Sequence, residues 1–190
     1  MTGRFPHMIT GAAKVHPGRA FDGPLWVHYG QAYVAVDEAE IDELDSCFRG
    51  QQNGICGAAV PGTLFLITGL HTGIVGFSLD VLPAEPELDD EWEDIVEVSF
   101  ETHEKDVVLE EWGGEGTHPF ELAPGTYRVR YCGRGMDQGS ELDTTPDDDT
   151  IVDTYALVFW PAPMAPDRIV RQSSENAAYW HDHAQGLTAG

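Results

Sequence analysis

The sequence has few basic side chains. Ten Lys and Arg residues stand against 33 Asp and Glu residues, which gives a formal net charge of -23 over 190 residues. A surface with this balance repels the phosphate backbone of nucleic acid and the anionic face of a membrane, and it attracts cations and basic protein surfaces. We therefore expect neither direct nucleic-acid binding nor membrane binding.

Long apolar runs are also absent. No stretch approaches the ~20 apolar residues that cross a bilayer, and residues 1–20 lack the apolar centre of a signal peptide. The three cysteines, Cys47, Cys56 and Cys132, cannot all pair within one chain, and none belongs to a C-x-x-C unit. We expect a cytoplasmic protein with reduced, partly buried thiols.

The sequence lacks the common catalytic motifs. It has no G-x-S-x-G elbow, no G-x-x-x-x-G-K-[ST] phosphate loop and no H-E-x-x-H pair. His181 and His183 lack the further ligands of a tetrahedral zinc site. We therefore predict a protein that is not an enzyme. The alternative, an uncharacterised hydrolase, requires a pocket with a histidine beside a thiol or a carboxylate.

Short apolar segments with strand periodicity are what the sequence does contain. Strands are predicted at residues 25–36, 63–68, 75–81, 94–102, 107–112, 120–122, 126–132 and 154–160. Glycine- and proline-containing turns separate most of them. This pattern favours an all-β fold, an antiparallel two-sheet β-sandwich with one or two short helices. A barrel is the alternative, because counting strands does not show whether a sheet closes.

The chain is expected to form one domain. Residues 1–23 are predicted to be a loosely ordered leader, residues 24–172 the β-sandwich domain, and residues 173–190 a tail with a possible short helix capped by Ser173 or Ser174. A further short helix is predicted within residues 37–48. Residues 133–150 are too long for an ordinary hairpin loop, which indicates a mobile or functional segment.

Acidic residues concentrate between Asp80 and Glu121, where Lys105 is the only Lys or Arg. Strand alternation places Glu97 and Glu101 on one face, directly after the cluster at residues 89–94. The predicted partner-binding surface consists of Asp89, Asp90, Glu91, Glu93, Asp94, Glu97 and Glu101. A hydrated surface that keeps the protein soluble accounts for the same residues. Arg128 and Arg130 are expected to pair with carboxylates on adjacent strands.

A second acidic group lies in the loop at residues 133–153. Asp147, Asp149 and Asp153 are weak candidates for Ca²⁺ ligands, because hard cations prefer several oxygen atoms gathered in one loop. Their spacing does not fit an EF-hand loop. We therefore predict no metal site and no cofactor. A β-sandwich that binds a small ligand or a cation through this loop is the alternative function.

Several segments resemble a known family. Phe120-Glu121-Leu122, Gly125-Thr126-Tyr127, the strand ending at Cys132, and Asp153-Thr154-Tyr155 are similar to the C-terminal half of the competence-protein-J family, and Tyr29-Gly30-Gln31 is similar to its early Tyr-x-Gln. The resemblance covers about half of the chain and implies a β-sandwich that inhibits a DNA-uptake nuclease. The composition also resembles that of uncharacterised actinobacterial proteins. The leader, the Asp-rich segment and the Pro-rich C-terminal extension depart from the family pattern.

These observations predict an acidic protein-binding module. Most concretely, we expect an inhibitor or immunity-type protein that mimics DNA and blocks a basic target such as a nuclease with a carboxylate-rich surface. The sequence does not indicate an oligomeric state.

Overall fold

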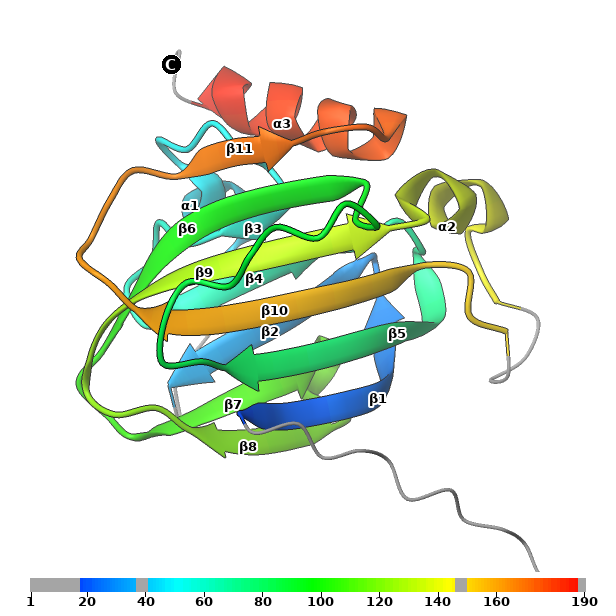
Figure 1. Ribbon diagram of the computed structural model, residues 1–190. Helices are drawn as coiled ribbons and strands as arrows, with labels where there is room; N and C mark the ends of the chain where they lie inside the picture. Colours follow the sequence, from blue (N-terminus) through cyan, green and yellow to red (C-terminus); the bar gives the residue numbers. More distant parts are fainter. Residues whose placement is uncertain (1–17, 37–40, 146–149, 188–190) are drawn as a thin grey trace, which may run out of the picture.

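One mixed β-sheet forms most of the molecule (Figure 1). The structure, a computed structural model, describes residues 18–36, 41–145 and 150–187. The strands are β1 (Arg19–His28), β2 (Gln31–Val36), β3 (Cys56–Gly57), β4 (Thr63–Ile67), β5 (Thr72–Val81), β6 (Asp94–Thr102), β7 (Asp106–Glu111), β8 (Thr117–Glu121), β9 (Gly125–Arg134), β10 (Thr154–Pro161) and β11 (Arg168–Arg171). Nine of them follow one path in the order β11-β6-β9-β10-β5-β1-β2-β4-β3. β7 pairs with β2, and β8 pairs with β7.

The predicted two-sheet sandwich is wrong. Hydrogen bonds link all described strands into a single strongly curled sheet, a half-barrel, and β10 runs parallel to β5 from Thr154↔Gly76 to Phe159↔Val81. Apolar alternation indicates that one face of a strand is buried, but it does not show which strands cover that face. Here the curl lets distant strands of the same sheet cover one another.

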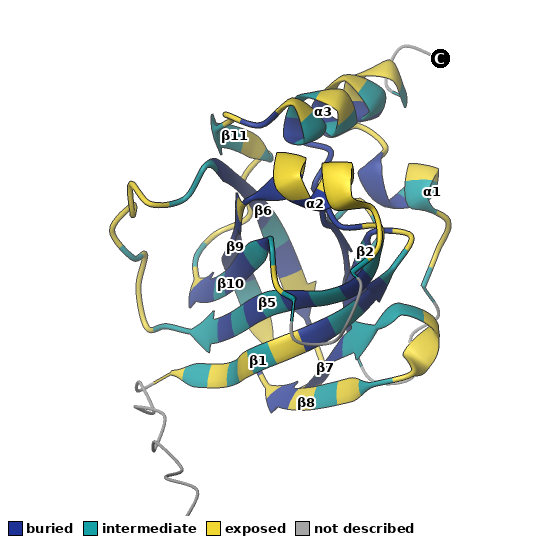
Figure 2. Cartoon of the chain, turned by 90° about the vertical axis from the view of Figure 1, so that its right-hand side faces the viewer, coloured by how far each residue is buried: buried dark blue, intermediate teal, exposed yellow. Residues whose placement is uncertain are grey.

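Aromatic contacts show how the curled sheet fills its own interior. Phe159 of β10 lies with its ring centroid 5.7 Å from that of Phe100 on β6, 5.7 Å from that of Phe120 on β8, and 6.4 Å from that of Tyr127 on β9. β8 and β10 are not neighbours in the sheet, so the Phe120–Phe159 contact crosses the interior. Burying rings of this size contributes much of the core's stability. Figure 2 shows that β2, β6 and β9 consist mostly of buried residues.

The α-helices α1 (Leu44–Phe48), α2 (Met136–Leu142) and α3 (Glu175–Leu187) gather at one end of the sheet, whereas the 3₁₀ turn η1 (Trp112–Gly114) lies between β7 and β8 (Figures 1 and 2). The tail helix is confirmed as α3, and the Ser174 hydroxyl accepts a hydrogen bond from the Ala177 N–H at 3.0 Å, as expected for a cap. No helix in the described ranges is long and apolar enough to cross a membrane.

Several expected boundaries differ from the structure. The strands predicted at residues 63–68 and 94–102 are confirmed as β4 and β6, whereas β11 and α2 were not predicted. Of the helix expected within residues 37–48, only α1 is helical among the described residues, and residues 37–40 lie outside them. β1 begins at Arg19, inside the segment predicted to be a leader.

Candidate functional site

Two of the seven predicted contact residues are buried. Asp94 is 0% exposed and Glu97 is 1% exposed, so neither presents its carboxylate to a partner. The Asp94 Oδ1 atom accepts hydrogen bonds from the backbone N–H groups of Ser173 at 2.8 Å and Ser174 at 3.1 Å, directly before α3. This carboxylate therefore fixes the start of α3 against β6.

Glu97 is the centre of an arginine cluster. Its carboxylate lies 2.9 Å from Arg130 Nη2, 2.8 Å from Arg168 Nη2 and 3.4 Å from Arg128 Nε. The strand register explains the arrangement, because Glu97 is paired with Arg130 on β9 and with Arg168 on β11. The predicted pairing of Arg128 and Arg130 with carboxylates of adjacent strands is confirmed. Both arginines are buried, so these pairs are not ordinary surface ion pairs.

The other five predicted contact residues are not fully buried, and four of them have partners within the chain, among them Asp89, whose Oδ1 atom accepts a hydrogen bond from the Glu91 N–H at 2.9 Å. Asp90 lies 2.6 Å from Arg171 Nη2, Glu91 lies 3.9 Å from Arg134 Nη1, and Glu93 accepts a hydrogen bond from the Gly135 N–H at 2.8 Å. Asp89 and Glu101 are exposed. That these residues contact a partner stays a prediction, and arginines on β9 and β11 partly neutralise the patch.

The Asp-rich loop offers little for a cation in the part that the structure describes. Asp153 is 0% exposed, and its Oδ2 atom accepts hydrogen bonds from the Tyr155 hydroxyl at 2.7 Å and the Leu70 N–H at 2.9 Å. Burial raises the pKa of this carboxyl group above its usual 3.8. Asp147 and Asp149 lie outside the described residues. Within the described ranges, no three His, Cys, Asp or Glu side chains are placed to hold a metal ion.

The three cysteines are free and buried in the structure. Burial raises the pKa of the Cys47 thiol to about 11 and that of the Cys132 thiol to about 12, and it raises the pKa of Cys56 further. A thiol with such a pKa is almost entirely protonated at neutral pH and is a poor nucleophile. The prediction of buried thiols without a disulfide is confirmed.

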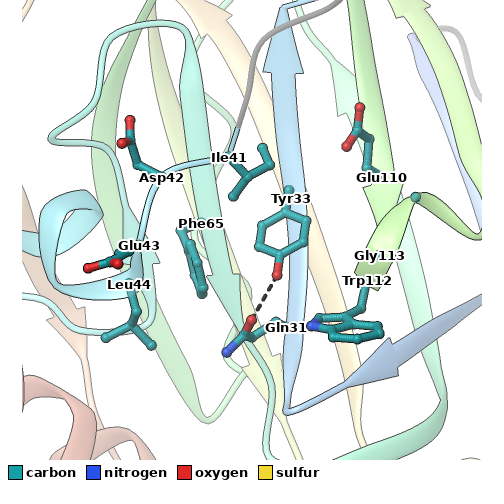
Figure 3. Close-up of a pocket in the computed structure, with 11 residues that line it drawn as sticks. Gln31, Tyr33, Ile41, Asp42, Glu43, Leu44, Phe65, Glu110, Trp112 and Gly113 are labelled. Atoms are coloured by element: carbon teal, nitrogen blue, oxygen red, sulfur yellow. Dashed lines mark hydrogen bonds between the residues drawn. The ribbon is translucent and has the colours of Figure 1, made fainter.

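A groove lined by residues of β2, β4, β7 and η1 combines aromatic walls with carboxylates (Figure 3). Its volume is about 480 Å³. We name it the Tyr33 groove; its lining residues are Gln31, Tyr33, Ile41, Asp42, Glu43, Leu44, Phe65, Glu110, Trp112, Gly113 and Gly114. None of these lining residues is Lys, Arg or His.

Strand pairing places the main side chains of the Tyr33 groove. β2 lies between β4 and β7, so Tyr33 has Phe65 as its cross-strand partner on one side and Glu110 on the other. The Tyr33 and Phe65 rings meet edge to face, with centroids 5.0 Å apart. Trp112 follows β7 directly, where η1 turns the chain toward β8. Figure 3 shows Tyr33 between Phe65 and Trp112.

The carboxylates of the Tyr33 groove come from two segments. Asp42 and Glu43 precede α1 and are exposed, and Glu110 on β7 is half-buried. Burial, followed by the nearby Cys47 and Glu110, raises the pKa of Tyr33 to about 12. The phenol is therefore neutral at physiological pH, and it donates a 2.7 Å hydrogen bond to Gln31 Oε1. The groove accordingly offers flat aromatic surface beside negative charge.

An exposed aromatic cluster adjoins the Tyr33 groove. Tyr29, at the turn between β1 and β2, is 54% exposed and has a left-handed φ of 55°. Its ring centroid lies 4.2 Å from that of His28, 5.2 Å from that of His71 and 5.5 Å from that of Trp112. Trp112 thus belongs both to this cluster and to the groove. A tyrosine at positive φ is uncommon, since glycine or asparagine usually occupies such positions.

The structure has a solved counterpart. The fold resembles that of ComJ. The crystal structure of ComJ, inhibitor of the DNA degrading activity of NucA, from Bacillus subtilis, superposes with a TM-score of 0.52 and 20% sequence identity, over 76% of this chain and 97% of that chain. Crocagin biosynthetic gene J matches with a TM-score of 0.48 and 13% identity, over 75% of this chain and 98% of that chain. No family model matches the sequence, and no curated protein matches it.

The similarity to ComJ confirms the resemblance found in the sequence, and the structure places the segments that carried it. Tyr29-Gly30-Gln31 forms the turn from β1 into β2, beside the Tyr33 groove. Gly125-Thr126-Tyr127 opens β9, and Asp153-Thr154-Tyr155 leads into β10. These segments lie at turns and strand starts. The β-sandwich that the resemblance implied is wrong, because the strands form one curled sheet.

Sequence reasoning missed the Tyr33 groove. Tyr33 fits the alternation of a buried strand and Trp112 fits the end of a strand, so neither residue by itself indicates a binding site. The groove arises because β2 pairs with β4 and β7 together, which periodicity does not encode. One available signal was Tyr29-Gly30, a tight-turn dipeptide with an aromatic residue at a position that disfavours it.

Proposed function

We propose that this protein is an inhibitor that binds a basic protein, most concretely a nuclease, through a carboxylate-rich surface. The fold shared with ComJ, the inhibitor of NucA, supports this assignment by analogy. The observation that carries it is the separation of charge. Five of the ten Lys and Arg residues lie on β9 and β11, whereas the Tyr33 groove is lined by three carboxylates and by no Lys, Arg or His among the residues that the structure describes.

Charge separation of this kind favours fast association with a basic partner. The net charge of -23 attracts a positive surface over a distance set by the ~8 Å screening length near physiological salt. Charge complementarity mainly raises the association rate, and added salt reduces that rate. An inhibitor that must reach its target before the target reaches DNA benefits directly from rapid association.

The exposed residues of the predicted patch remain part of this proposal. Reversing the charge of Glu101 or Asp89 is expected to weaken the complex by about 1 kcal/mol where the pair is desolvated, and by less at the rim. Asp90 and Glu91 lie beside arginines of the same chain, so we expect smaller effects from them. A cytoplasmic location, predicted from the sequence, is proposed with this function.

A nuclease assay tests the function. Basic proteins from the source cells are separated on a cation-exchange column, and each fraction is assayed for DNA degradation with and without the purified protein. We expect the protein to suppress degradation in at least one fraction, and the suppression to weaken as salt is added. NucA itself serves as a defined second target. Full nuclease activity in every fraction and with NucA, at low salt and excess protein, would contradict the proposal.

A further inference from the structure

We propose that an exposed cluster of aromatic rings around Tyr29 is the centre of the surface that contacts the basic partner protein. We name it the Tyr29 cluster; its members are His28, Tyr29, His71 and Trp112. The inference rests on the proposed function and adds the place where the partner binds. Two observations carry it: the backbone that displays Tyr29 is unfavourable for tyrosine, and the rings around it are fixed in place.

Tyr29 occupies a turn position that favours other residues. His28 pairs with Gln31 across the end of the hairpin that β1 and β2 form. Tyr29 and Gly30 are therefore the two turn residues, with φ angles of 55° and 63°. Two positive φ angles are typical of a type I′ turn, which favours Asn-Gly and Asp-Gly, and a bulky side chain at such a position costs conformational energy. Burial does not compensate for this cost, because Tyr29 is 54% exposed.

A second unusual backbone conformation lies beside the Tyr29 cluster. In the described ranges, Tyr29 and Asp143 are the two residues other than glycine with positive φ. Asp143 has φ 64° and ψ −57°, and the peptide groups on either side of it form a 2.7 Å hydrogen bond, which is the rare and strained form of γ-turn. His71 joins the two segments: its N–H donates to the Asp143 carbonyl at 3.0 Å, and its carbonyl accepts from the Gly30 N–H at 2.9 Å. Strained backbone that the surrounding structure holds in place is concentrated at functional sites.

Hydrogen bonds and ring contacts fix the rings of the Tyr29 cluster. The Thr72 hydroxyl oxygen lies 2.8 Å from His28 Nδ1 and 2.8 Å from His71 Nδ1, so one side chain orients both imidazoles. The His28 ring lies between two others, with its centroid 4.2 Å from that of Tyr29 and 4.7 Å from that of Trp112. Aromatic side chains that are already held in place lose little conformational entropy when a partner covers them. The cluster is therefore suited to tight contact.

The charge of the chain determines the kind of partner that covers the Tyr29 cluster. With a net charge of -23, the protein attracts a basic surface. Exposed carboxylates stand close to the rings: Asp143 adjoins the cluster, and Asp42 and Glu43 line the Tyr33 groove, which shares Trp112 with it. Protein interfaces commonly have a centre in which tyrosine and tryptophan contribute most of the binding energy, surrounded by a polar rim. The occupant is therefore a basic protein that covers the rings and pairs its own rim with these carboxylates.

Replacing Tyr29 with asparagine separates binding from stability. Asparagine is favoured in this turn, and the relief of strain offsets the lost ring contacts, so Tyr29→Asn should unfold within about 3 °C of the wild type or above it. Its inhibition of a nuclease that the wild type inhibits should be weaker by about thirtyfold or more, which corresponds to about 2 kcal/mol.

Two matched variants accompany Tyr29→Asn. Tyr29→Phe keeps the ring and should inhibit within about threefold of the wild type. Tyr179→Ala removes another exposed tyrosine, which lies on α3, is 63% exposed and does not belong to the Tyr29 cluster, and it should inhibit within about twofold of the wild type. In addition, the nuclease should shift the signal of the Trp112 indole N–H when it is added to the ¹⁵N-labelled full chain.

The outcomes distinguish this inference from the proposed function. Equal inhibition by Tyr29→Asn and Tyr179→Ala, or an unchanged Trp112 signal in the complex, would refute the Tyr29 cluster as the contact surface and leave the function standing. A fall in Tm of more than about 6 °C in Tyr29→Asn would assign the ring to folding and also overturn the inference. If the wild type inhibits neither NucA nor any nuclease fraction, the proposed function fails and the inference fails with it.

Discussion

Glu97→Gln is expected to destabilise the protein strongly. The substitution keeps the size of the side chain but removes the charge that the three arginine side chains share. Those of Arg128 and Arg130 are only 8% and 4% exposed, whereas that of Arg168 is 57% exposed and can turn into water. Two buried guanidinium groups would therefore lose their main counter-charge.

The size of the effect follows from what the two buried arginines retain. Removing one partner of a buried ion pair costs about 3–5 kcal/mol. Arg130 keeps contacts with Glu85 Oε1 and the Pro86 carbonyl, and Arg128 keeps the carbonyl of Ala165. We therefore expect the lower end, about 3 kcal/mol, which corresponds to a fall in Tm of about 6–12 °C for a domain of this size.

Urea denaturation followed by circular dichroism measures the free energy of unfolding. Glu101→Gln is the matched control, because Glu101 lies on the same strand and is exposed, and its substitution should change the free energy by no more than about 0.5 kcal/mol. Adding Arg130→Met to Glu97→Gln should restore part of the loss, since it removes one buried charge. Equal stability of Glu97→Gln and Glu101→Gln would refute the reasoning.

Three further outcomes are expected. Iodoacetamide should label Cys47 and Cys132 in the native protein only slowly at neutral pH, because their pKa values are raised to about 11 and 12. Mass spectrometry should show fast labelling once denaturant is added. Fast labelling of the native protein would contradict the burial of these thiols. The raised pKa of Asp153 means that the native state holds this proton more tightly than the unfolded chain does. The stability of the wild type relative to Asp153→Asn should therefore be highest below pH 3.8 and should fall as the pH rises through the native pKa, as measured by denaturation across that range. An increase in relative stability with pH would show that the pKa of Asp153 is lowered in the native state. Ser174→Ala should lower the free energy of unfolding by about 1 kcal/mol, because it removes the cap of α3. Ser173→Ala should leave the unfolding midpoint close to that of the wild type. Equal effects of the two substitutions would show that Ser174 is not the cap.

Local structure was largely predictable from the sequence. The alternation around Val96 and Val98 marks β6, and Ser174 before Ala177 marks the start of α3. The pairing of strands was not predictable, because it depends on contacts between segments far apart in the chain. The parallel pair of β10 with β5 is such a contact, and it turns the expected sandwich into one curled sheet.

The candidate site was also predictable only in part: its residue types were, and its tertiary contacts were not. The sequence indicated a concentration of carboxylates, but strand alternation alone placed Glu97 on a solvent face. β11 pairs with β6 in the sheet, and nothing in the periodicity of residues 168–171 predicted a strand that brings the Arg168 side chain to Glu97. In the Tyr33 groove, the lining residues come from four segments of the chain, and the pairing of β2 with both β4 and β7 brings three of them together.

The position of β10 has a consequence for synthesis of the chain. This strand occupies the gap between β9 and β5, so the sheet is incomplete until residue 161 is available. During translation, the edges of β5 and β9 remain without their final neighbour, and unpaired edges are prone to join those of other chains. Nascent chains that stop before β10 should therefore depend on chaperones, and their release from the ribosome should lead to aggregation instead of a smaller folded product.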